Sequence, residues 1–298
     1  MRKSAPRASI AAGRLPKANP RLFNAAHARA VKEEICAAGR KLWLRGLVDG
    51  AGGNISCRVG SNEVISTPTM LCKHDLKPAD LCMVDLEGNQ IAGLKSRTSE
   101  VLLHLEIYKA VPEAKAVVHC HPPHDGAYAI TGRVPPVAVM SEFELFIGPV
   151  AFSPYETPGT AAFAKTVLPF VRQHNTVLLA NHGTVCWADT VTHAEWCAEV
   201  LENYCATLLH SSQLGEPVST IAERKIEDLL AIKKRLGLPD RRFSPVQGKG
   251  RRAERGAPGA IAVPAVPQKS RRGKEREIDL DDLVRIVTRE VLKTIGRE

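Results

Sequence analysis

The amino-acid sequence predicts an α/β domain, in which helices cover a layered sheet, followed by a flexible tail. Short apolar segments, such as residues 117–118 and 176–180, indicate buried strands. Longer segments between them repeat apolar residues at helical spacing, and hairpin turns occur early in the chain. Strands interspersed with helices in this way are typical of one layered α/β domain, which we place at residues 22–243.

The first elements surround a glycine-rich turn. A helix is expected over residues 24–46, where apolar residues recur at helical spacing. The turn at residues 49–56 then leads into an extended segment at 57–59. Its backbone N–H groups can converge on an anion, with Asn54 and Ser56 as side-chain partners, but a plain hairpin loop accounts for the same residues equally well.

Strands and helices alternate through the rest of the domain. Two strands are expected at 64–67 and 81–86, followed by a helix over 98–111 that begins with a hydroxyl cap and has Glu100 in its first turn. The elements expected after it are a strand that ends at His121, a short helix at 125–130, a strand at 136–139, a further segment at 150–155, a helix at 159–173, a strand at 176–180, and helices at 190–211 and 219–236.

The formal net charge of +9 comes from the ends of the chain and not from its body. Residues 1–21 contain six bases and no acid, and residues 245–277 contain nine bases against three acids, which leaves the body slightly acidic. Because the body has no basic bias, nucleic-acid binding is not expected. We interpret residues 1–21 as a disordered basic arm, and a transit peptide is the second interpretation.

Apolar runs and cysteines indicate the compartment. No apolar run approaches the roughly 20 residues of a membrane span, so no membrane association is expected. The eight cysteines lie mostly in apolar stretches and include no Cys-x-x-Cys pair. Reduced, buried thiols in a cytoplasmic protein have this pattern, whereas a disulfide framework does not.

A pair of histidines marks the main candidate site. His119 and His121 end an apolar run, and side chains two apart on a strand leave on the same face, so both imidazoles can bind one metal ion. For an isolated pair, one structural and one solvated histidine are the alternative interpretation. His182, at the polar end of the 176–180 strand, and Glu100 add two donors. Together the four side chains match the ligand set of a catalytic zinc site with an exchangeable position.

These residues belong to motifs that resemble the class II aldolase and adducin family over roughly residues 25–217. The motifs follow the family's order and spacing, and they are Gly53-Asn54-Ile55-Ser56, Ser66-Thr67-Pro68-Thr69, Thr98-Ser99-Glu100, Val118-His119-Cys120-His121-Pro122, Pro154-Tyr155 and Asn181-His182-Gly183. Their common order is far more specific than any single motif. Within the family, the chain most resembles the sugar-phosphate enzymes of the L-fuculose-1-phosphate aldolase type.

The resemblance implies a role for each matched residue. His119, His121 and His182 become zinc ligands, and Glu100 becomes the carboxylate that binds the empty metal and then acts as general acid/base. The implied phosphate pocket consists of Gly53, Asn54, Thr69, Thr98 and Ser99. The implied reaction is the cleavage of L-fuculose or L-rhamnulose 1-phosphate into dihydroxyacetone phosphate and lactaldehyde, with Zn²⁺ as the Lewis acid.

Three positions depart from the family pattern. Ala51 replaces a threonine of the phosphate pocket, and Met70 replaces a glycine. The tyrosine that protonates the aldehyde oxygen falls near Met140, and Glu142, Glu144 or a residue of a neighbouring subunit are the candidates to replace it. A pentulose-phosphate 4-epimerase and a decarboxylase of the same family therefore stay open, as does a non-catalytic, adducin-like binding module, although such modules lack the metal ligands.

The resemblance extends to assembly and location. It implies a homotetramer with sites at subunit interfaces. Residues 244–277 are rich in Pro, Gly and Arg and indicate a linker, and residues 278–298 predict an amphipathic helix. That helix resembles the encapsulation peptides that carry enzymes into bacterial microcompartments, so shell proteins are expected partners and the microcompartment lumen is an expected location beside the cytoplasm. An oligomerisation helix accounts for the same apolar stripe.

Overall fold

The computed structural model describes residues 17–238 and 240–243. The expected linker at 244–277 and the expected helix at 278–298 lie outside the described residues, together with residues 1–16 of the expected basic arm. A short 3-10 helix, η1 (Pro20–Asn24), begins just before the expected start of the domain. Among the described helices, none is long and apolar enough to cross a membrane.

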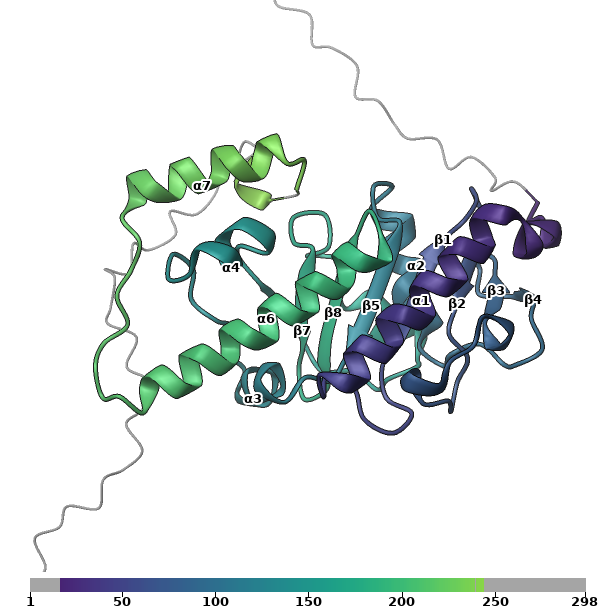
Figure 1. Ribbon diagram of the computed structural model, residues 1–298, viewed down its shortest axis with the longest axis horizontal. Coiled ribbons are helices and arrows are strands. Elements are labelled where there is room, and N and C mark those ends of the chain that lie inside the picture. The colour runs from purple at the N-terminus through teal and green to yellow at the C-terminus, as the bar shows by residue number, and fades with distance from the viewer. Residues whose placement is uncertain (1–16, 239, 244–298) are drawn as a thin grey trace, which may run out of the picture. The chain divides into compact units, whose positions relative to one another are not determined.

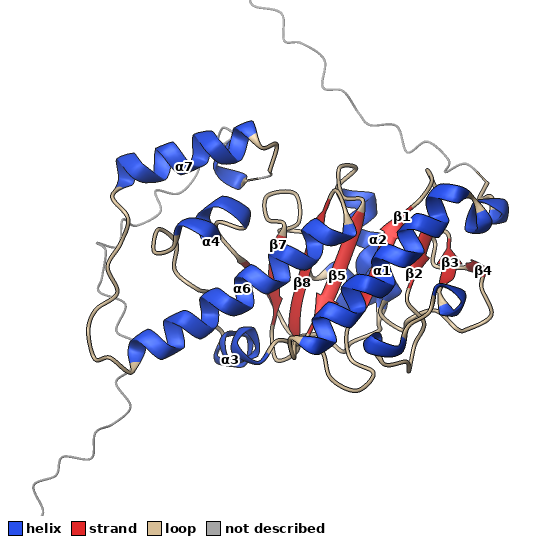
Figure 2. Cartoon of the chain, in the orientation of Figure 1, coloured by secondary structure: helices blue, strands red, loops and turns tan. Residues whose placement is uncertain are grey.

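An eight-stranded sheet forms the centre of the described residues (Figures 1 and 2). The strands are β1 (Asn54–Arg58), β2 (Val64–Ser66), β3 (Cys82–Val84), β4 (Gln90–Ala92), β5 (Ala116–Cys120), β6 (Ala151–Ser153), β7 (Thr176–Leu179) and β8 (Gly183–Ala188). Their order across the sheet is β4-β3-β2-β1-β5-β8-β7-β6, and all neighbours are antiparallel except β6 and β7. The central strand β5 therefore pairs with β1 on one side and β8 on the other.

Helices cover both faces of this sheet. The α-helices are α1 (Ala26–Leu44), α2 (Val101–Ala110), α3 (Pro123–Thr131), α4 (Ser141–Phe146), α5 (Ala161–Lys165), α6 (Val191–Ser212) and α7 (Glu223–Arg235). Figure 1 shows α1 and α6 in front of the sheet and α2 behind it. The expected α/β fold with a helix-covered sheet is thereby confirmed.

Two apolar cores lie on the two faces, and β5 contributes to both. Val118 and Cys120 pack in the core that α1 and α6 cover, whereas Val117 packs in the core that α2 covers. Because side chains alternate along a strand, His119 points to the same face as Val117. The alternation of side chains along β5 therefore points His119 toward the start of α2, the helix that follows Glu100.

Two expected elements are wrong, and their backbone contacts explain why. Residues 136–139 form no strand: the carbonyl of Pro136 accepts from the Tyr204 hydroxyl at 2.8 Å, and that of Ala138 accepts from Ile221 N at 2.7 Å. The helix expected at 159–173 is α-helical only over α5 and continues as turns, since Pro169 supplies no N–H donor. The structure also contains α4, β4 and β8, which were not expected from the sequence.

A glycine in α1 sets how closely this helix approaches the segment after β2. A Cβ added at Gly39 would lie 2.8 Å from the carbonyl oxygen of Lys73 and 3.2 Å from a methyl group of Leu76. Real Cβ atoms do not approach a backbone oxygen this closely, so only glycine fits here without a shift of the short helix η2 (Lys73–Asp75).

We therefore expect Gly39→Ala to destabilise the protein by about 1–3 kcal/mol, although alanine has the higher helix propensity. Gly126→Ala in α3 is the matched control, because a Cβ there meets open space, and it should stabilise the fold by about 0.5–1 kcal/mol. Urea unfolding of both variants measures the difference. Equal stabilisation by the two alanines would refute the close approach.

Candidate metal centre

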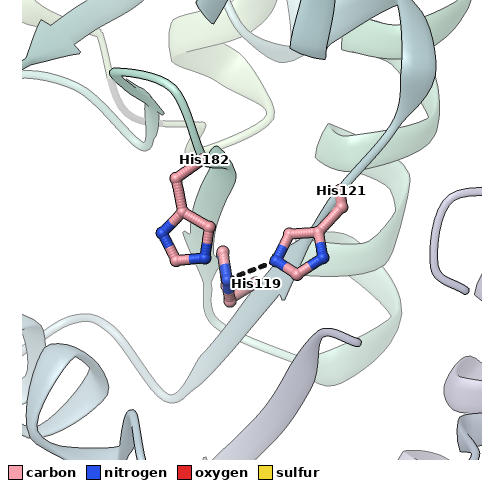
Figure 3. Close-up of side chains that lie close together, drawn as sticks. All are labelled: His119, His121 and His182. Atoms are coloured by element: carbon pink, nitrogen blue, oxygen red, sulfur yellow. Dashed lines mark hydrogen bonds between the residues drawn. The ribbon is translucent and has the colours of Figure 1, made fainter. Parts of the chain in front are cut away.

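Two histidines of the β5 end face one another across a short gap. His119 lies on β5 and is fully buried, and His121 follows the last strand residue, Cys120. Their Nε2 atoms lie 3.0 Å apart, as the dashed line in Figure 3 shows. Pro122 and Pro123 then end the strand, and α3 begins. The expectation that both rings share one side of the strand is confirmed.

A tight turn between β7 and β8 presents the third histidine. His182 lies in this turn, where its backbone N–H donates to the carbonyl of Leu179 at 3.1 Å. Asn181 adopts a φ of +54°, a left-handed conformation that asparagine tolerates better than most residues. A Cβ at Gly183 would overlap the carbonyl oxygen of Cys120, so glycine lets β8 approach β5 and brings His182 to the pair (Figure 3).

The carboxylate of Glu100 lies beside His119 and His182. Glu100 is the N-cap of α2 rather than a first-turn residue, and its Oε2 lies 3.3 Å from His119 Nε2 while its Oε1 lies 3.4 Å from His182 Nε2. The side-chain amide of Asn54 donates to Oε2 at 2.8 Å. Four donors predicted from three separate motifs thus lie close together.

Their spacing fits a tetrahedral metal ion. The three histidines offer nitrogen atoms that all lie within 4.8 Å of one another. Tetrahedral zinc with Zn–N bonds of 2.0–2.1 Å separates its ligand atoms by about 3.3 Å. The observed separations of 3.0, 3.3 and 3.4 Å among His121, His119, Glu100 and His182 agree with that value. The residues can therefore hold one metal ion with Glu100 in the fourth position.

The tautomer of His119 is fixed by a neighbour that the sequence analysis missed. His119 Nδ1 lies 2.9 Å from the carbonyl oxygen of Thr184 and donates to it, which leaves Nε2 as the metal donor. The Thr184 hydroxyl in turn donates to the buried carboxylate of Asp125 at 2.9 Å. A single threonine in an apolar strand is a weak signal in the sequence, and only the β5–β8 pairing shows that its carbonyl faces His119.

Protonation states agree with metal binding. Burial lowers the pKa of His121 to about 3 and that of His182 to about 4, so both rings are neutral donors. Burial raises the pKa of Glu100, but the adjacent His119, the amide of Asn54 and His182 hold it well below its usual range. The carboxylate is therefore ionised.

His104 lies one turn beyond Glu100 on α2 and is fully buried. Its Nδ1 lies 2.7 Å from the Ser56 hydroxyl, which lies 2.8 Å from the Tyr108 hydroxyl. These contacts join α2 to β1, the strand that carries Asn54. Burial lowers the pKa of His104 to about 3, so the ring stays neutral.

The expected phosphate-pocket residues come from three segments that touch one another. Ile55 N donates to the Thr67 hydroxyl at 3.2 Å, and Thr98 N donates to the Thr67 carbonyl at 3.1 Å. These bonds bring Asn54, Thr69 and the 98–99 segment together beside Glu100. Gly53 has a φ of +68°, and a Cβ there would lie 2.8 Å from the His119 carbonyl oxygen. Met70, where the family pattern has glycine, adopts a φ of +54°.

The structure separates the two glutamates that were candidates for a second acid. Glu142 is exposed on α4. Glu144 is buried, accepts from Ala138 N, and forms an ion pair of 2.8 Å with Arg242. Because both of its carboxylate oxygens already have these partners, Glu144 is a poor candidate for a catalytic acid.

Comparison with known proteins identifies the family to which the chain belongs. The family model of the Class II Aldolase and Adducin N-terminal domain matches residues 33–209. The chain belongs to this family. The predicted family is thereby confirmed, and the expected lyase class agrees with the aldolases among its relatives.

Individual relatives carry different names. The chain is 34% identical over 201 residues to 5-deoxy-D-ribulose 1-phosphate aldolase from Bacillus thuringiensis, covering 66% of this chain and 92% of the relative. It is 31% identical over 204 residues to 3-oxo-tetronate 4-phosphate decarboxylase from Haemophilus influenzae, covering 67% and 96%. The solved structure of an L-fuculose 1-phosphate aldolase is 25% identical, with a TM-score of 0.62, covering 69% of this chain and 96% of that one.

The histidine cluster predicts a loss of metal in the double variant His119→Ala/His121→Ala. Two of three nitrogen ligands are removed, so we expect its zinc content after dialysis to fall to about a tenth of the wild-type value or less. Elemental mass spectrometry measures the content. His193→Ala, which removes an exposed histidine outside the cluster, should keep full metal content. Wild-type zinc content in the double variant would refute the site.

Burial of His104 predicts a pH dependence of the metal-free protein. The folded ring stays neutral to about pH 3, whereas the unfolded chain takes up a proton near pH 6.5, so the unfolded state binds more protons as the pH falls. This group should lower the free energy of unfolding by about 1.4 kcal/mol per pH unit below pH 6.5. Urea unfolding gives the free energy of unfolding at several pH values between about 6.5 and 4.5. For His104→Gln, its change per pH unit should be smaller than in the wild type by this amount. The same pH dependence in the wild type and in His104→Gln would contradict the lowered pKa of His104.

Proposed function

We propose that the protein cleaves a ketose 1-phosphate by a zinc-dependent retro-aldol reaction. L-Fuculose and L-rhamnulose 1-phosphate are the candidate substrates, with dihydroxyacetone phosphate and lactaldehyde as products. The observation that carries the proposal is the carboxylate of Glu100, which lies 3.3 Å from His119 and 3.4 Å from His182. A carboxylate in the exchangeable position can give way to substrate oxygens and then act beside the reacting carbon.

The contacts among the segments at 53–55, 67–69 and 98–99 support a phosphate site next to this carboxylate. The backbone N–H groups of Thr69 and Thr98 donate to Ser96 and Thr67, so their hydroxyl groups are the donors for a phosphate. The Asn54 side chain lies between this pocket and Glu100, since its amide donates to the carboxylate. One substrate can thus place its phosphate on these segments and its oxygens at the histidines.

The reaction breaks the C3–C4 bond of the ketose. The C4 hydroxyl loses its proton and becomes the aldehyde, and the electron pair of the broken bond stays with the three-carbon half. A bound Zn²⁺ would act as Lewis acid for the negative charge that develops there. The ionised Glu100 carboxylate takes up a proton from solvent, which balances the proton lost from the C4 hydroxyl, and delivers it to C3, while Asn54 keeps the carboxylate oriented. The base for the C4 hydroxyl is Glu142 or a residue of a neighbouring subunit in a homotetramer.

The second candidate is a decarboxylation at the same site, because the Haemophilus influenzae relative named 3-oxo-tetronate 4-phosphate decarboxylase matches 67% of this chain. Loss of CO₂ also leaves an electron pair on a carbon next to a carbonyl, so the same Lewis acid and proton donor serve both reactions. A 4-epimerase would need the same cleavage followed by re-addition. The four converging metal donors argue against a non-catalytic, adducin-like module.

Product analysis separates these reactions. Zinc-loaded, full-length protein is incubated with L-fuculose, L-rhamnulose and 5-deoxy-D-ribulose 1-phosphates, with a pentulose 5-phosphate, and with 3-oxo-tetronate 4-phosphate. Dihydroxyacetone phosphate from a ketose 1-phosphate supports the aldolase, CO₂ supports the decarboxylase, and an epimeric pentulose supports the epimerase. Turnover that is equal with and without zinc would refute the mechanism.

The role of Glu100 predicts a specific defect in Glu100→Gln. The histidines remain, so zinc should still bind, while kcat should fall by about 10² to 10⁴ because the proton carrier is lost. Steady-state kinetics together with zinc analysis measure both quantities. Glu106→Gln on the same helix replaces a glutamate that pairs with Lys109, and it should leave kcat within about twofold. A Glu100→Gln variant with wild-type kcat would exclude the proposed proton transfer.

A further inference from the structure

Lys73 lies in η2 and is buried beside the glycine-rich turn, with a side chain that is 1% exposed. Its ammonium donates to the carbonyl oxygen of Ala51 at 2.9 Å and to that of Leu71 at 2.7 Å. Ala51 belongs to the glycine-rich turn, and Leu71 belongs to the segment after Thr69. One ammonium group therefore joins two of the segments that border the phosphate pocket.

The partners of the Lys73 ammonium differ from those of the other two buried lysines in the described residues. Lys233 forms an ion pair of 2.9 Å with Asp240, and the Lys32 ammonium lies 3.1 Å from the centre of the Phe23 ring. Lys73 has carbonyl acceptors, and no carboxylate in the described part of the chain forms an ion pair with it. Burial lowers the pKa of Lys73 to about 8. A buried cation without an anionic partner is costly, so an anion bound nearby would stabilise it.

The position of Lys73 identifies the site that such an anion would occupy. A Cβ at Gly52 would lie 3.0 Å from His121 Nδ1, so the turn that accepts the Lys73 hydrogen bond also packs on a metal ligand. The ammonium thus lies on the turn that packs against His121.

We propose that Lys73 is the positioning and specificity-determining residue of the phosphate pocket. It holds the turn at Ala51 against the segment at Leu71, and its positive charge selects a dianionic phosphate monoester over an uncharged sugar. The inference rests on the proposed function, because it assigns a residue to the phosphate site of that reaction. Ala51, which lacks the hydroxyl that the family pattern has at this position, contributes through the carbonyl that holds Lys73.

The test measures the affinity of full-length, zinc-loaded protein for inorganic phosphate by calorimetry. We expect Lys73→Met, which keeps the length of the side chain without its charge, to bind phosphate about tenfold more weakly or worse, with unchanged zinc content. Lys233→Met is the matched control. It removes a buried lysine that already has Asp240 as its partner, so it should lower the melting temperature and leave phosphate affinity within about twofold.

Each outcome decides the role of Lys73. Unchanged phosphate affinity in folded Lys73→Met would make this residue purely structural and overturn the inference, and so would a wild type that does not bind phosphate. If Lys73→Met does not fold, Lys73→Gln, which keeps an amide donor for the carbonyls, is measured in the same way. Because binding is measured without turnover, an inactive wild type that binds phosphate through Lys73 would refute the proposed reaction and leave this inference standing.

Discussion

The register of β5 between β1 and β8 is the constraint on which the site depends. His119 lies opposite Asn54 on β1 and opposite Val185 on β8. Residues directly opposite in an antiparallel pair share a face, so His119 and Asn54 both reach Glu100 at the start of α2. A shift of one residue would turn His119 to the face that α1 covers. Strand pairing, and not a mobile loop, therefore sets the distance between the metal-binding nitrogen and the carboxylate.

The charges around this point suit a dianionic substrate. His121 and His182 are neutral, so the ionised Glu100 is the group that would partly offset a divalent ion. In the proposed complex, a divalent ion and Glu100 would together leave one positive charge, and the buried ammonium of Lys73 would add a second. A phosphate dianion between the metal and the glycine-rich turn would balance both.

The sequence was sufficient for the metal donors because their signals are local. His119 and His121 follow from alternation along one strand, and His182 follows from the polar end of another. Thr184 and Lys73 could not be found in this way, since their roles depend on the β5–β8 register and on burial behind a turn. The strand expected at 136–139 was wrong for a related reason: its backbone groups bond to Tyr204 and Ile221, which lie far away in the sequence.

Glu144 belongs to a buried cluster of charged side chains. Lys233 and Asp240 are both fully buried and lie 2.9 Å apart, and the guanidinium of Arg242 donates to Asp240 at 2.7 Å and to Glu144 at 2.8 Å. Lys233 also donates to the carbonyl of Ile147 at 2.9 Å, so the cluster ties α7 to the end of α4. Loss of one member leaves the others buried without a partner, which destabilises a fold strongly. Glu144 therefore positions α4, and we infer that the proton acceptor in the proposed cleavage is another residue.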